Sequence, residues 1–173
     1  EYIIAFKDFF KKAKSCNPDV IYVGGDIVHS KTQGISPELI QCLCWWFNKL
    51  ADICPVHVIL GNHDGLILNK DRQDAITPII KAINNPNIYL YKDSGIYETG
   101  YPGFKWCVFS CFDEENWKNI NPNKDDINIA LYHGSISRSK TDMNWTMTNG
   151  EDEISIFKDF DFSIFTKIKI RSW

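Results

Sequence analysis

In the first half of the chain, segments with apolar residues at helical spacing alternate with short, mostly apolar runs. Every third or fourth residue is apolar in three segments, which predicts helices at 1–15, 37–51 and 77–83. Two short continuous apolar runs predict buried strands at 20–23 and 56–60. Ser36-Pro37 and Thr77-Pro78 have the residue types of a helix N-cap and first turn, so they mark the starts of the second and third helices.

The second half is rich in short strand-like runs separated by Gly, Pro and Asn. These runs predict strands within 87–91, 95–100, 104–112 and 127–132. Beyond them, Asn149-Gly150 predicts a turn, residues 151–160 a helix and residues 161–165 one more strand. Helices that alternate with strands and are then followed by further strands predict an α/β layered sandwich, and the length of 173 residues favours a single domain spanning 1–173.

Composition narrows the class of protein without choosing a function. The chain is 44% hydrophobic and 14% aromatic, which favours a packed core over disorder. Its net charge of -3 gives no overall attraction to nucleic acid, so such binding would need a local basic patch. Because the six cysteines lack zinc-ribbon spacing and the chain shows neither a signal-peptide pattern nor a membrane-spanning apolar run, we expect reduced thiols in a cytoplasmic protein.

Polar side chains follow three of the predicted strands, in the segments "YVGGDIVH", "VILGNHD" and "IALYHG". These segments place Asp26, Asn62 and His133 where the strands end, and sites in layered α/β folds gather at the carboxyl ends of strands. Taken singly, each has a structural explanation: Gly-Gly-Asp is typical turn chemistry, and a lone histidine after a strand is more often structural. The three together favour a metal site.

The donor types indicate which metal chemistry to expect. Aspartate, asparagine and histidine are mixed oxygen and nitrogen ligands, which suit manganese, iron or zinc, whereas thiolates would indicate a structural zinc. A central carboxylate can bridge two cations about 3.5–4 Å apart, an arrangement that polarises a phosphoryl oxygen and activates a water for phosphoester hydrolysis.

The motifs "GGDIVH", "GNHD" and "YHG", in this order, resemble those of the calcineurin-like metallophosphoesterases. The GDxxH form and the wording "GDIVHSKTQGISPELI" are similar to the DNA-repair exonuclease branch, the nuclease subunit of the SbcCD type with its phage and viral relatives. The resemblance covers most of the chain, to about residue 165. It implies a layered α-β-β-α sandwich and a phosphodiesterase or nuclease that acts on DNA with two divalent metal ions, most often Mn²⁺, with Fe or Zn as alternatives.

The resemblance also implies roles for the metal-binding residues. Asp26 corresponds to the carboxylate that bridges both metals. Asn62 and His133 correspond to ligands of the second metal.

Three further residues correspond to catalytic positions of the family. His63 would approach the scissile phosphate as a general acid or transition-state stabiliser, and Asp64 would support its loop. His29 would help to position the DNA phosphate; the alternatives are a loop histidine bound to backbone for His29 and a turn residue for Asp64. His57 lies between apolar neighbours in the middle of a strand, which favours a structural role.

The chain departs from the family pattern at both ends. The family's Asp-x-His motif lies on an earlier strand, and this chain, which starts inside the first helix, contains none. The family's Gly-x-His motif is expected after residues 161–165, but "TKIKIRSW" at 166–173 has neither glycine nor histidine. We therefore expect a truncation at both ends, with a frame slip or mis-splice near Thr166. Because the first metal would keep only Asp26, we expect this polypeptide to be impaired.

By resemblance, the expected partners are DNA ends and an SMC-like ATPase, and the chain could also form a homodimer. We expect no membrane association and a cytoplasmic location at the nucleoid or a viral replication site. Two other functions stay open. One is a phosphatase or nucleotide phosphodiesterase on the same scaffold, because a fold alone does not choose a substrate. The other is a catalytically dead member that serves as a binding module.

Overall fold

The helices and strands follow the predicted order as far as residue 132. The computed structural model describes residues 2–29, 34–69, 72–134, 140, 144–146 and 148. The elements are α1 (Tyr2–Ser15), β1 (Ile21–Val23), α2 (Pro37–Ala51), β2 (Val56–Ile59), α3 (Thr77–Ile83), β3 (Ile88–Tyr91), β4 (Gly95–Glu98), β5 (Phe104–Phe109), the 3-10 helix η1 (Glu114–Asn119) and β6 (Ile127–Tyr132). The elements expected at 149–165 and the segment 166–173 lie outside the described residues.

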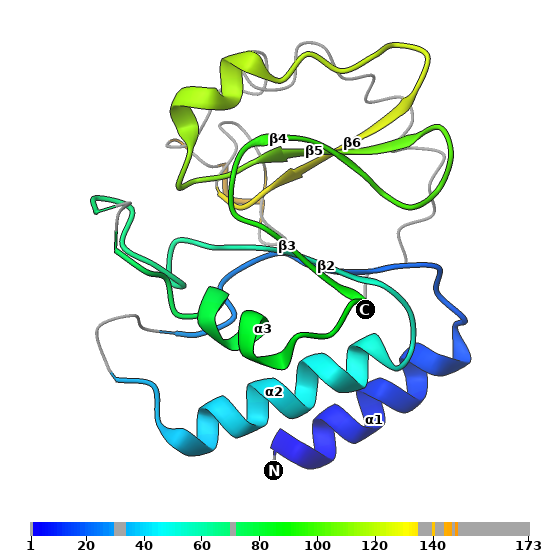
Figure 1. Cartoon of the computed structure of the whole chain (residues 1–173), viewed down its shortest axis with the longest axis vertical. Helices are drawn as coiled ribbons and strands as arrows, with labels where there is room; N and C mark the ends of the chain where they lie inside the picture. Colours follow the sequence, from blue (N-terminus) through cyan, green and yellow to red (C-terminus); the bar gives the residue numbers. More distant parts are fainter. Residues whose placement is uncertain are drawn as a thin grey trace.

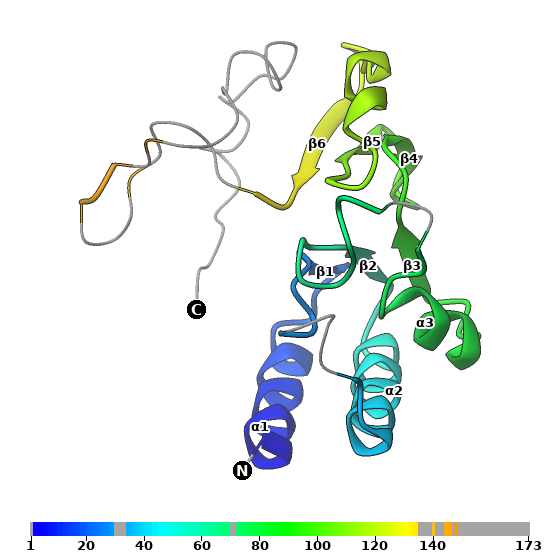
Figure 2. The same cartoon turned by 90° about the vertical axis from the view of Figure 1, so that its left-hand side faces the viewer.

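The strands form two three-stranded sheets (Figure 1). Sheet A has the order β1-β2-β3 with every pair parallel, and sheet B has the order β4-β5-β6, with β4 antiparallel and β6 parallel to β5. The helices α1, α2 and α3 lie on one side of sheet A, and sheet B lies on the other side (Figures 1 and 2). The expected α/β layered sandwich is therefore confirmed.

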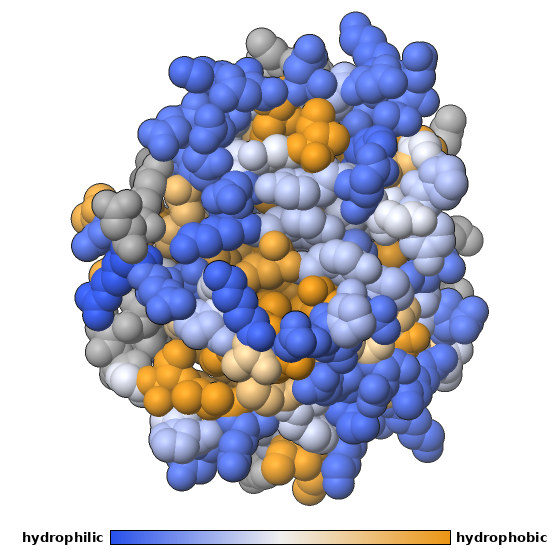
Figure 3. Space-filling view, in the orientation of Figure 1, coloured by the Kyte–Doolittle hydropathy of each residue, from blue (hydrophilic) through white to orange (hydrophobic). Residues whose placement is uncertain are grey.

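One hydrophobic core joins the helical layer to sheet A. Its most buried side chains include Phe47 and Leu50 of α2 with Val56 and Val58 of β2, all fully buried. The apolar stripe predicted for 37–51 supplies this α2 face, because residues three and four apart share one side of a helix. In the same orientation as Figure 1, Figure 3 shows hydrophobic side chains between hydrophilic ones over the helical layer.

A second core lies between the sheets and contains His57 of β2, which is 2% exposed. The Trp106 indole N–H of β5 donates to His57 Nδ1 at 3.1 Å, and the Tyr91 hydroxyl lies 2.8 Å from the same nitrogen. Because an indole N–H can only donate, Nδ1 must accept and the proton of the neutral ring sits on Nε2. This geometry agrees with the structural role that the sequence predicts for His57.

Replacement of His57 by glutamine is expected to flatten the pH dependence of stability between pH 7.5 and 5. Burial lowers the pKa of His57 below the usual 6.5, so the unfolded chain binds a proton that the folded chain rejects. The contribution of neutral His57 is therefore complete above about pH 6.5 and is lost as the pH falls towards its folded pKa. Thermal unfolding at several pH values measures this slope; equal slopes in the variant and the parent protein would contradict the assignment.

Candidate metal centre

The ends of β1 and β2 bring the first two motifs together. Because β1 and β2 are parallel neighbours, their carboxyl ends meet at one edge of sheet A. Gly25 follows β1 with φ +90° and Asp26 with φ +52°, so the chain turns sharply there. A Cβ added to Gly25 would lie 2.6 Å from the Gly61 nitrogen, which only glycine avoids. The two loops therefore touch through their backbones.

Side chains from three strand ends converge at this point. The His133 Nε2, beyond β6 of sheet B, lies 3.3 Å from Asp26 Oδ1 and 3.2 Å from Asn62 Oδ1. A cation held about 2.1–2.3 Å from its ligands places neighbouring ligand atoms about 3.0–3.4 Å apart. The two separations match that spacing, so Asp26, Asn62 and His133 could share one ion.

The orientation of His133 suits a metal ligand. Its Nδ1 lies 2.7 Å from the Gly24 carbonyl oxygen, and a carbonyl can only accept, so Nδ1 carries the proton. The lone pair is then on Nε2 and faces two acceptor oxygens. Three acceptors that face one another repel unless a cation or a proton lies between them. A ligating histidine commonly donates its other ring N–H to a carbonyl, so the residues fit a divalent metal.

His63 lies next to this donor set. Its backbone N–H donates to Asp26 Oδ1 at 3.0 Å, which orients the carboxylate. Its Nδ1 lies 2.6 Å from the His29 carbonyl oxygen and therefore donates to it. The rings of His29 and His63 stack with centroids 5.7 Å apart and planes 15° apart. The structure thus gives His29 a contact with His63 that the sequence did not predict, and its expected contact with a DNA phosphate remains a prediction.

Asp64 is fully buried and ties the two loops together. Its Oδ1 accepts from the Val28 N–H at 3.0 Å, and its Oδ2 accepts from the Gly61 N–H at 2.8 Å. Burial raises the pKa of Asp64 and the nearby Asp26 charge adds to this, while the backbone hydrogen bonds oppose it. A fully buried side chain is not placed to touch a substrate, and these hydrogen bonds join the loop after β2 to the loop after β1. The supporting role that the resemblance implies for Asp64 remains a prediction.

The donor set is small and mixed. Among the described residues, no group of three or more His, Cys, Asp and Glu side chains is placed to hold a metal, so Asn62 is needed as the third donor. All six cysteines are free thiols, and burial raises the pKa of Cys107 and Cys111 to about 11, which disfavours thiolate ligands. The described residues thus offer a ligand set for one cation, and Asp26 as a bridge to a second cation remains a prediction.

Sequence reasoning missed the parts of the site that belong to the backbone. The carbonyls of Gly24 and His29, which orient two imidazoles, have no side-chain signal. The close approach of Gly25 and Gly61 had a signal, since each glycine directly precedes a functional residue. The Gly-Gly-Asp pattern by itself indicates only a turn at Gly25.

Comparisons with known proteins agree with this geometry. A family model described as calcineurin-like phosphoesterase matches residues 2–165. The chain is 36% identical over 177 residues to the "Uncharacterized protein R555" of Acanthamoeba polyphaga mimivirus, a match that covers 94% of this chain and 13% of that protein. The longest described helix, α2, has 15 residues, and none of the described helices could span a bilayer. Because the family model matches nearly the whole chain, the chain belongs to the calcineurin-like phosphoesterases, a family of hydrolases that act on phosphoesters with divalent metal ions.

Proposed function

We propose that the chain is the catalytic domain of a metal-dependent nuclease that hydrolyses phosphodiester bonds in DNA. The observation that carries the proposal is the convergence of Asp26, Asn62 and His133 at separations that suit a cation. The GDxxH form of the first motif, "GDIVH", supports a nuclease over a phosphoprotein phosphatase, whose motif is typically GDxxDRG.

The chain's own residues have separate tasks in this proposal. Asp26, Asn62 and His133 hold the cation, which when bound polarises a phosphoryl oxygen and lowers the pKa of a water. His63 keeps its Nδ1 proton on the His29 carbonyl, so its Nε2 is the atom that can hold or give a proton to the leaving oxygen. The His29 ring, stacked on His63, limits the rotation of that imidazole.

Oxygen and nitrogen donors without thiolates suit Mn²⁺, Fe or Zn alike. We propose Mn²⁺ as the working metal by resemblance to the exonuclease branch. We further propose a second cation on Asp26, DNA ends as substrate and an SMC-like ATPase as partner, all by resemblance to the exonuclease branch. The chain spans only 13% of the length of the mimivirus relative that it matches. The substrate and the partner of the whole protein are therefore proposals.

The test uses the full-length product of the gene, because the 173-residue polypeptide alone is expected to be impaired. It measures degradation of linear duplex DNA with and without Mn²⁺, beside hydrolysis of bis-p-nitrophenyl phosphate and p-nitrophenyl phosphate. We expect metal-dependent cleavage of DNA and of bis-p-nitrophenyl phosphate. The cleavage rate should fall by about 100-fold or more in Asn62→Ala, which removes a metal ligand, and in His63→Ala, which removes the proton donor. Asn119→Ala is the matched control, since Asn119 is exposed on η1.

Three outcomes would contradict the proposal. Cleavage of the monoester alone would indicate a phosphatase. DNA binding without hydrolysis under all metals would indicate a binding module. Unchanged cleavage in Asn62→Ala would remove Asn62 from the site.

A further inference from the structure

The loop that carries His63 is pressed against a side chain from the other sheet. Gly65, two residues after His63, is buried, and a Cβ on Gly65 would lie 2.8 Å from Cε1 and 2.9 Å from Cζ of Phe112. The φ of Gly65 is not positive, so the backbone conformation itself would accept a side chain there. The edge of the Phe112 ring therefore occupies the space beside Gly65 and blocks movement of this end of the loop towards the ring.

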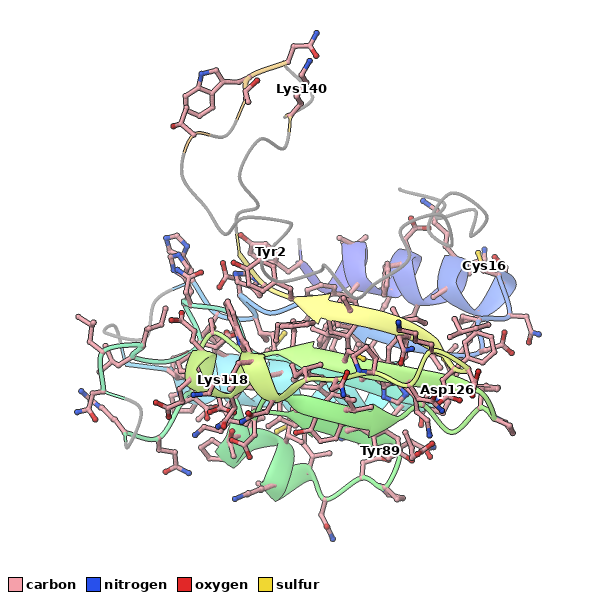
Figure 4. The ribbon with its side chains drawn as sticks, turned by 90° about the horizontal axis from the view of Figure 1, so that it is seen from above. Tyr2, Cys16, Tyr89, Lys118, Asp126 and Lys140 are labelled. Carbon is pink, nitrogen blue, oxygen red and sulfur yellow. The ribbon has the colours of Figure 1, made fainter. Side chains whose placement is uncertain are left out.

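Phe112 follows β5 of sheet B but packs outside that sheet. Because β5 and β6 are parallel, the loop after β5 lies at the same end of sheet B as His133. Figure 4 shows this end beside η1, where Lys118 is labelled, and the opposite end at Asp126. Phe112 is 7% exposed and belongs to the hydrophobic core that joins the helical layer to sheet A. A side chain that follows sheet B thus reaches the core on the side of sheet A.

The loop that carries Phe112 is held by its own hydrogen bonds. The Phe112 N–H donates to the Ser110 hydroxyl at 3.2 Å, and the Trp117 indole N–H donates to the Ser110 carbonyl at 2.9 Å. The Ser110 N–H donates in turn to the Ser94 hydroxyl at 3.1 Å. These partners belong to sheet B and its connections, so the position of Phe112 does not depend on the loop that carries His63.

Asp64 fixes the same loop by polar contacts. Its carboxylate accepts two backbone N–H groups, and its carbonyl accepts from the Ala75 N–H at 2.8 Å. His63 lies directly before Asp64 and Gly65 directly after it. Because peptide units are rigid, a shift of Gly65 would be passed to His63 through only two of them. The contact between Gly65 and Phe112 is therefore close enough to affect where the imidazole lies.

We propose that Phe112 is a positioning residue for His63, whose ring holds the loop so that His63 Nε2 meets the leaving oxygen. The proposal rests on the nuclease function proposed above, in which His63 gives a proton to that oxygen. A misplacement of about 1 Å in a reacting group costs about 100-fold in rate. Loss of the ring should affect proton transfer more than metal binding, because Asp26 contacts the other end of the loop, at Gly61.

The dependence of hydrolysis on the leaving group tests this role in the full-length product of the gene with Mn²⁺. As the P–O bond to the aryl group breaks, p-nitrophenolate leaves readily without a proton, whereas phenolate needs one. Weaker proton donation therefore slows diphenyl phosphate more than bis-p-nitrophenyl phosphate. In Phe112→Leu we expect the ratio of the second rate to the first to rise about tenfold or more. His63→Ala should raise the ratio as well, and Phe112→Leu should add nothing to it, because both changes act on one proton transfer.

Phe109→Leu is the matched control. Phe109 is a phenylalanine of β5 that is 2% exposed, and its ring packs against Trp117 with centroids 6.1 Å apart. The control loses the same atoms from a buried site and should lower the melting temperature as Phe112→Leu does. We expect it to keep the leaving-group ratio of the parent protein.

Gly65→Ala reaches the same contact from the opposite side. The added Cβ meets the Phe112 ring, so the loop must shift although no aromatic ring is lost. The leaving-group ratio should again rise about tenfold or more. This variant keeps the test decisive if Phe112→Leu does not fold.

Amide hydrogen exchange measures the position of the loop without catalysis. The Asp64 N–H donates to the Gly61 carbonyl at 3.1 Å, and the Ala75 N–H to the Asp64 carbonyl, so both amides report opening of the loop. In the metal-free protein we expect them to exchange about tenfold faster in Phe112→Leu than in Phe109→Leu.

Two outcomes would overturn the role of Phe112. One is a leaving-group ratio in Phe112→Leu and Gly65→Ala equal to that of the parent protein while His63→Ala raises it. The other is an equal rise in Phe109→Leu, which would show general loosening of the fold. A ratio that His63→Ala leaves unchanged would instead overturn the proton donation on which the proposal rests, so the two failures are distinguishable.

Discussion

Replacement of Gly61 by alanine is expected to weaken Mn²⁺ binding by about 100-fold or more and to remove hydrolytic activity with it. A Cβ on Gly61 would overlap the backbone nitrogen and the carboxylate of Asp26, so one of the two loops must move. Gly61 is buried, which leaves the strained group no open space to enter. A displacement of about 1 Å in a reacting group costs about 100-fold in rate, and the same carboxylate is the proposed centre of the metal site.

In the full-length product of the gene, isothermal titration with Mn²⁺ measures the first effect, and cleavage of bis-p-nitrophenyl phosphate measures the second. Gly34→Ala is the matched control, because a Cβ on Gly34 meets nothing within 4 Å and needs no unusual φ. Binding of Mn²⁺ by Gly61→Ala at the affinity of the parent protein would show that Asp26 is not a ligand.

Asp64→Ala is expected to lower the free energy of unfolding by about 2–6 kcal/mol, since each of two backbone N–H groups left without an acceptor costs about 1–3 kcal/mol when buried. The groups are the N–H of Val28 and the N–H of Gly61, which Asp64 bonds through separate oxygens. Asp64→Asn should cost less, because its amide oxygen can still accept one of the two bonds.

Denaturant unfolding, with comparison of the midpoints, measures this loss. The matched control is Asp52→Ala, which removes an exposed ion pair with Lys49 and should cost less than about 1 kcal/mol. Equal effects at Asp64 and Asp52 would show that the Asp64 carboxylate does not hold the loops.

The elements of the fold could be predicted because their signals are local. The start of α2 is an example: the Ser36 side chain accepts from the Leu39 N–H at 3.2 Å, and Pro37 occupies the first turn. Both features lie within four residues of one another, so a short stretch of sequence is enough to predict where α2 begins. The 3-10 helix η1 gave no comparable signal, because neither a capping side chain nor a long apolar stripe marks it.

The site was predictable only as far as side chains reveal it. Asp26, Asn62 and His133 were visible as polar residues at strand ends, and the structure brings them together. What fixes them is contributed by backbone atoms, such as the Gly24 carbonyl that orients His133. The direction of a carbonyl depends on dihedral angles such as φ +90° at Gly25, which a one-dimensional pattern does not encode.

The partners of His57 were hidden for a related reason. Its burial follows from apolar neighbours on the same strand, but Trp106 is 49 residues away in the chain and belongs to the other sheet. Only the packing of sheet on sheet decides which donor meets the imidazole. Long-range pairs of this kind need the three-dimensional arrangement.

The origin of the three donors has a mechanical consequence. Asp26 and Asn62 follow strands of sheet A, whereas His133 follows a strand of sheet B. An ion bound by all three would therefore cross-link the two sheets at one end of the sandwich. Binding of the metal should therefore raise the free energy of unfolding by about 2.7 kcal/mol at a free metal concentration 100 times Kd. Conversely, a displacement of one sheet along the other would separate His133 from Asp26 and Asn62 and weaken metal binding.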